Sequence, residues 1–149
     1  MRFWTSIRAR VAERRHRHGL VDTSVVIDLG RIDAGDLPLE IAISAVTLAE
    51  LAAGPHATAD PAERARRQDR LQRTESTFEA LPVDATVARA YGRIYAAVVA
   101  AGRKARGRRA FDLLIAATAL SRALPLYTRN PGDFSELDGL VEVVAVSTP

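Results

Sequence analysis

The sequence predicts an α/β fold in which a parallel sheet carries helices on both faces. Short apolar runs typical of buried strands alternate along the chain with segments of helical periodicity, and most of these segments follow a capping residue. The 149 residues suffice for about one domain. We therefore expect one folded unit over residues 20–149, preceded by a basic arm over residues 1–19.

Five short apolar runs are candidate strands: residues 20–21, 41–43, 81–83, 126–128 and 141–146. The helices expected between them cover residues 24–29, 44–53, 61–77, 84–102 and 112–120. Ser24, Ser44, Asp60 and Asp84 are the expected N-caps, because a side-chain oxygen at that position accepts a hydrogen bond from a free backbone N–H. The last helix, opened by Asp112, is apolar on nearly all sides and must be buried. A turn is expected over residues 130–133.

The composition excludes several kinds of chemistry. The chain has no cysteine, so disulfides, thiolate zinc sites and cysteine nucleophiles are excluded. With 48% apolar and 26% charged residues, it can bury a core, unlike disordered chains of low hydrophobicity. No apolar run is long enough for a membrane span, and no leader-like segment is present. We expect a cytoplasmic protein.

The basic residues are unevenly distributed around a net charge of +3. Residues 1–19 contain six arginines and one acid. A second basic segment lies shortly before Asp112 and consists of Arg103, Lys104, Arg106, Arg108 and Arg109. Clusters of this kind bind polyanions such as RNA, and these side chains are placed to contact phosphates beside Asp112. The alternative is a solvated, arginine-rich face.

Four carboxylates are expected at one edge of the sheet. Asp22 ends the first strand, Glu50 lies on the helix after the second, Asp133 follows the strand at 126–128, and Asp112 opens the buried helix. Two like charges about 4 Å apart repel by about 4 kcal/mol at an effective dielectric of about 20, which calls for protonation or a divalent cation. Oxygen ligands favour Mg²⁺ or Mn²⁺, and such ions catalyse phosphodiester hydrolysis.

Each acid also has a purely structural explanation. Asp22 is compatible with a strand-end turn, and Asp112 with a cap or first-turn residue that is stabilised by the helix dipole. Glu50 is compatible with a solvent-facing helix position, and Asp133 with a turn that follows a Pro-Gly pair.

Four segments resemble the motifs of PIN-domain ribonucleases, and above all those of VapC toxins. The segments are residues 22–28, 44–51, 112–119 and 128–134. The resemblance implies a three-layer α/β/α sandwich that forms a homodimer. It also implies a divalent-metal-dependent endoribonuclease that cleaves structured RNA and is held inactive by a cognate antitoxin. The acidic site implied by the resemblance consists of Asp22, Glu50, Asp112 and Asp133, supported by Ser24, Thr128 and Asn130.

Two other functions compete with this interpretation. A phosphoacceptor receiver domain also places acids at strand ends, but it needs a lysine after a late strand, and Lys104 is the only lysine in the chain. A non-catalytic module that binds nucleic acid or a protein partner, with structural acids, stays open. Metal-dependent cleavage of RNA distinguishes the ribonuclease from this non-catalytic module.

Overall fold

A computed structural model describes residues 16–147 and contains one parallel sheet. Its five strands run in the order β3-β2-β1-β4-β5. They are β1 (His18–Val21), β2 (Glu40–Ser44), β3 (Ala80–Leu81), β4 (Leu126–Thr128) and β5 (Val143–Ala145). The predicted parallel sheet is confirmed. The first strand begins inside the segment expected to form the basic arm, and residues 1–15 lie outside the described part of the chain.

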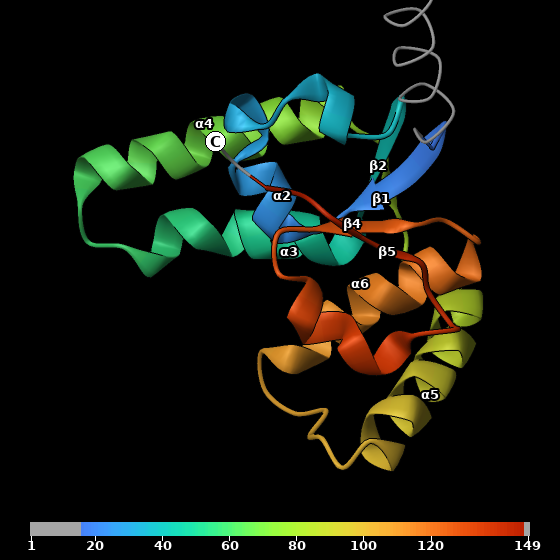
Figure 1. Cartoon of the computed structure of the whole chain (residues 1–149). Helices are drawn as coiled ribbons and strands as arrows, with labels where there is room; N and C mark the ends of the chain where they lie inside the picture. The colour runs from blue at the N-terminus through green and yellow to red at the C-terminus, as the bar shows by residue number, and fades with distance from the viewer. Residues whose placement is uncertain (1–15, 148–149) are drawn as a thin grey trace, which may run out of the picture.

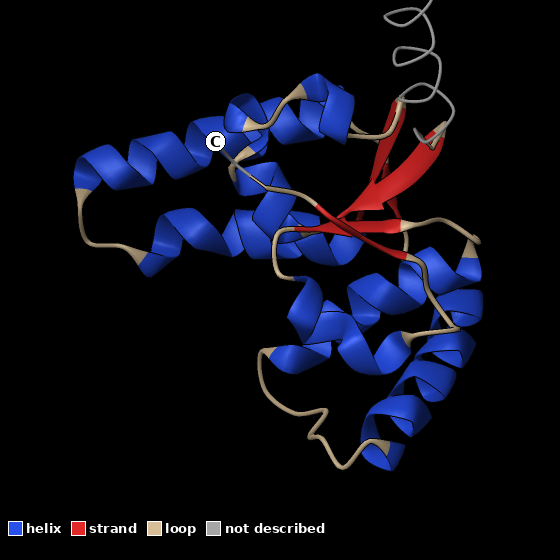
Figure 2. Ribbon diagram, viewed as in Figure 1, coloured by secondary structure: helices blue, strands red, loops and turns tan. Residues whose placement is uncertain are grey.

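Helices lie on both sides of this sheet (Figures 1 and 2). They are α2 (Thr23–Ile27), α3 (Ala45–Ala53), α4 (Pro61–Thr77), α5 (Ala85–Ala100) and α6 (Arg109–Ser121). Short 3₁₀ turns complete the fold: η1 (Leu29–Arg31), η2 (Ala34–Asp36), η3 (Gly54–Ala57) and η4 (Pro131–Leu137). Helices α5 and α6 pack together on one side, while α3 and α4 form a hairpin that projects from the sheet (Figure 1). Within residues 16–147, no helix has the length and apolar character that a bilayer crossing requires.

Three of the expected N-caps are confirmed and one is wrong. Ser44 Oγ accepts from the backbone N–H of the second residue of α3 at 3.1 Å. Asp60 accepts from the second residue of α4, and Asp84 accepts from the third residue of α5. Helix α2 is capped by Asp22 rather than Ser24, because the chain stays extended through Asp22 and Ser24 already lies inside the helix. Asp112 does not open α6 either, since the helix begins three residues earlier and Asp112 sits in its first turn.

Several other expected boundaries also differ from the structure. The strand expected over 81–83 ends at Leu81, because Pro82 has no N–H to donate to a ladder. The last strand is limited to Val143–Ala145 within the expected 141–146. The turn expected at 130–133 is the start of the longer 3₁₀ segment η4.

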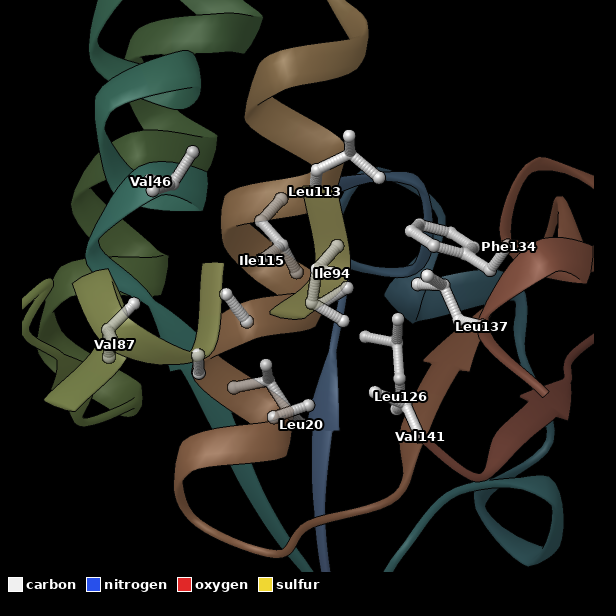
Figure 3. Close-up of a cluster of buried hydrophobic side chains, with 14 of the residues drawn as sticks. Leu20, Val46, Val87, Ile94, Leu113, Ile115, Leu126, Phe134, Leu137 and Val141 are labelled. Atoms are coloured by element: carbon white, nitrogen blue, oxygen red, sulfur yellow. The ribbon is translucent and has the colours of Figure 1, made fainter. Parts of the chain in front are cut away.

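Alternation along the central strand builds two separate cores. Leu20 belongs to the hydrophobic cluster on the α5/α6 side, which also contains Ile94, Leu113 and Phe134 (Figure 3). Val21, the next residue, belongs to the cluster on the opposite face. Burying a large aliphatic side chain stabilises the fold by about 1.5–3 kcal/mol, and α6 contributes apolar residues over most of its circumference. This explains why α6 lacks a polar face.

Candidate active site

Asp22 lies where β1 ends, and its carboxylate is held by several donors. Oδ1 accepts from the Ser24 hydroxyl at 2.6 Å and from the Val25 N–H at 3.1 Å. The side chain is only 5% exposed. Burial raises the pKa of Asp22, and hydrogen bonds from the hydroxyls of Ser24 and Thr128 and from backbone N–H groups partly offset this rise. Asp22 is therefore a fixed carboxylate in a partly desolvated place.

The polar residues around Asp22 join the ends of β1 and β4. Besides its bond to Asp22, Ser24 accepts a hydrogen bond from the backbone N–H of Arg129 at 3.1 Å. Thr128 is fully buried, and its hydroxyl accepts from the backbone N–H of Asn130 at 3.0 Å. The Asn130 residue is exposed, and its side chain makes no cap bond to η4. Two of the three residues expected to support the site thus contact an acid.

Glu50 reaches the same region from α3. The Thr23 hydroxyl donates to Glu50 Oε1 at 2.7 Å and lies 3.0 Å from the hydroxyl of Thr47. Thr23 therefore couples the first turn of α2 to α3. Thr23 was not predicted as a site residue, although its place between Asp22 and Ser24 in the first motif was an available signal.

Asp112 links the four carboxylates electrostatically. Its pKa is raised from 3.8 to about 6, first by burial and then by the charges of Glu50, Asp22 and Asp133, while Arg109 acts in the opposite direction. A Coulombic effect of this kind falls with distance, so all three acids lie near Asp112. Glu50, Asp22 and Asp133 thus act electrostatically on Asp112, and the assignment of the four acids as a catalytic and metal-binding set stays a prediction.

The donor set suits a hard divalent cation, but the coordination shell is not preassembled. In residues 16–147, no three acidic or histidine side chains are arranged to hold a metal ion as they stand. Carboxylate oxygens are nevertheless the ligands that such cations take. The raised pKa of Asp112, caused first by burial and then by the other three acids, shows a cost of its negative charge that a bound cation would lower. Asp133 is exposed, so its position is the least constrained of the four. The fit thus rests on donor chemistry and charge, and a complete shell requires side-chain movement.

Comparison with known proteins identifies the family. The PIN domain family matches residues 19–140. The chain belongs to the PIN-domain family. It is 41% identical over 133 residues to Ribonuclease VapC5 of Mycobacterium tuberculosis, covering 86% of this chain and 95% of that protein. It is also 40% identical over 104 residues to Ribonuclease VapC8 of the same species, covering 68% and 89%.

A solved structure agrees with this assignment. The crystal structure of VapBC-5 from Mycobacterium tuberculosis, a member of the VapBC family of toxin-antitoxin systems, matches with a TM-score of 0.76 and 41% identity. The match covers 87% of this chain and 99% of that chain. The resemblance inferred from four motifs and the α/β fold are thus confirmed. PIN-domain ribonucleases generally depend on divalent metal ions.

The basic residues before α6 in this PIN domain fall into two groups. Arg109 forms an ion pair with Glu136, whose side chain is 2% exposed, and Arg103 lies 3.5 Å from the same carboxylate. These two arginines fasten the start of α6 to η4, the segment that carries Asp133. The remaining cations are exposed and have no ion pair with any described residue: Lys104, Arg106 and Arg108. A sequence pattern does not distinguish these groups.

Proposed function

We propose that this PIN-domain protein is the toxin of a toxin–antitoxin pair, an endoribonuclease that uses Mg²⁺ or Mn²⁺ to hydrolyse phosphodiester bonds in structured RNA. The observation that carries the proposal is the rise in the pKa of Asp112 to about 6, to which three other carboxylates contribute. The names of the relatives, Ribonuclease VapC5 and Ribonuclease VapC8, support the same activity.

The four acids have distinct parts in this proposal. Asp22, Glu50, Asp112 and Asp133 would hold the ion, which supplies charge neutralisation at the phosphate and a more acidic attacking water. Asp22 is the rigid member, because hydroxyl and backbone donors fix its orientation. Glu50 is steered by a threonine hydroxyl, and exposed Asp133 is free to adapt to the substrate.

Three further residues complete the proposed site. Thr128 and Ser24 orient Asp22 through their hydroxyls, so they act on the acid rather than on RNA. Asn130 is exposed beside them, where its amide can meet a phosphate oxygen or the attacking water.

RNA approaches an acidic site only if cations offset the repulsion. We assign this role mainly to Lys104, Arg106 and Arg108, since Arg103 and Arg109 are already paired with a glutamate. Neutralising the three exposed cations should weaken RNA binding and lower its salt dependence by up to about 0.7 per contact in a log–log plot for single strands. Binding that is unchanged across salt concentrations refutes this assignment.

The partners belong to the same proposal. The solved relative is described as a toxin-antitoxin system, and we propose that a cognate antitoxin covers the acids of this chain and offers them a basic side chain. We further propose a homodimer that acts in the cytoplasm, where its RNA substrate is found.

Cleavage of total RNA tests the function directly. The purified protein is incubated with RNA in Mg²⁺, in Mn²⁺ and in EDTA, and cleavage sites are mapped. Asp22→Asn, purified identically, should not cut, because asparagine is still a good N-cap but lacks the charge. Asp138→Asn, an exposed acid of the same region, is the matched control and should cut normally. RNA binding without cleavage in either metal decides for the non-catalytic module.

A further inference from the structure

A cleft of about 590 Å³ lies between the α3–α4 hairpin and the start of α6. Its volume is in the range of about 300–1,000 Å³ that is usual for ligand sites. Its lining includes Thr23 and Glu50, the pair described above, so the cleft is continuous with the acidic site. The rest of the lining comes from residues of α4 and from the residues at the start of α6. A substrate held by the acids would extend into this cleft.

Phe111 is an aromatic residue of this lining that the core does not explain. Its side chain is 49% exposed, although burying a ring of this size is worth about 1.5–3 kcal/mol. It belongs to neither of the two core clusters, while Leu113 and Ile115 of the same helix are fully buried. It also directly precedes Asp112. An exposed ring at this place has the chemistry to stack on an unpaired base.

Two arginines of the lining are available for phosphates. Along α4, most arginines are committed to acids of the same helix: Arg66 and Arg67 pair with Glu63, and Arg73 pairs with Asp69. Arg70 is half-buried in the cleft wall and has no ion pair with any of the residues that the structure describes. Arg108 contributes a second such guanidinium from the other side of the cleft.

We propose that this cleft binds the single-stranded RNA next to the scissile bond, with one base stacked on Phe111 and phosphates contacted by Arg70 and Arg108. The inference rests on the proposed ribonuclease function and adds to it a recognition site for an unpaired nucleotide. Two guanidinium groups that have no ion pair with any described residue favour RNA as the occupant, because they need anionic partners. Stacking uses the face of a base, so the cleft selects unpaired nucleotides more than a base identity.

Binding is tested in an Asp22→Asn background, so that the RNA stays intact. Fluorescence anisotropy measures the Kd of a labelled single-stranded RNA and of copies with one abasic nucleotide at each position in turn. Phe111→Leu should weaken binding roughly five- to a hundred-fold, whereas Phe111→Trp should preserve it. Arg70→Gln should lower the salt dependence. Tyr95→Leu is the matched control, an aromatic residue of α5 that is 44% exposed and is not part of the cleft.

The abasic series gives a readout that a structural role of Phe111 would not change. At one position, the abasic nucleotide should weaken binding to the parent protein. The same abasic RNA should bind Phe111→Leu no more weakly than intact RNA does, because the stacked base and the ring form one contact. Equal affinity of parent and Phe111→Leu, or no sensitive position, overturns the cleft assignment. If Phe111→Leu weakens the binding of an antitoxin but not the binding of RNA, the cleft is a protein interface and the assignment to RNA is also overturned. Failure of the wild-type protein to cut in Mg²⁺ or Mn²⁺ overturns the proposed function separately.

Discussion

The charge of Asp112 should destabilise the metal-free protein, and Asp112→Asn should relieve this cost. The rise of its pKa from 3.8 to about 6 corresponds to roughly 3 kcal/mol, at about 1.4 kcal/mol for each tenfold change in proton affinity. Because the side chain is only partly buried, solvent screening reduces the expected gain to roughly 1–2 kcal/mol. An unusual result follows, in which removal of a proposed catalytic acid stabilises the fold.

The sign of the effect depends on pH. The folded state binds the proton of Asp112 more tightly than the unfolded state does, so the protein incurs no cost below pH 3.8. The cost grows between pH 3.8 and about 6 and is fully present at higher pH. Urea unfolding in EDTA should therefore show Asp112→Asn to be more stable at pH 7.5, with most of the difference lost at pH 4.5.

Two comparisons make this prediction refutable. Asp138→Asn removes a charge from an exposed position and should change stability by less than about 0.5 kcal/mol at either pH. Mn²⁺ should raise the melting temperature of the parent protein more than that of Asp112→Asn, because a bound cation relieves the same repulsion. If Asp112→Asn is less stable than the parent at pH 7.5, the charge of Asp112 carries no net cost in the folded protein and the reasoning fails.

Three further substitutions test the surroundings of the site. Ser24→Ala removes one donor and one acceptor, so urea unfolding should show a loss of roughly 1–2 kcal/mol, and equal stability would contradict the described bonds. Gly19→Ala places a Cβ 2.6 Å from the ring of Tyr127, and thermal melts should show a loss of roughly 1–3 kcal/mol unless the ring moves without cost. Glu136→Gln leaves Arg109 of α6 without its ionic partner, so the free energy of unfolding in urea should fall by roughly 3 kcal/mol. A change near zero would show that the ion pair contributes nothing to stability.

The helix caps show what the local sequence decides. Ser44, Asp60 and Asp84 were predicted correctly because a cap bond joins atoms only two or three residues apart. Ser24 was assigned incorrectly because Asp22 competes for the same role, and the choice depends on how far β1 stays extended. That length is set by pairing with β2 and β4, which lie elsewhere in the sequence.

The basic segment shows what local sequence leaves undecided. Its five cations look equivalent in the sequence, yet Arg103 and Arg109 are engaged by Glu136, about 30 positions further along the chain. The cleft beside Glu50 is equally hidden, because its walls come from α3, α4 and α6. The residue types alone indicated the candidate acids. Only the tertiary structure distinguishes the cations that form ion pairs with η4 from the cations that face solvent.

Strand order explains why the acids meet where they do. The chain adds β2 and β3 on one side of β1 and then returns to place β4 on the other side. The sheet therefore has its switch point between β1 and β4, and in open parallel sheets the ligand site lies there, beyond the carboxyl ends of the strands. Asp22 directly follows β1 and Thr128 ends β4, and a hydrogen bond joins their side chains. Any PIN-type chain that keeps this strand order has a switch point between β1 and β4. The strand order therefore determines where the site lies, and the acids determine what it binds.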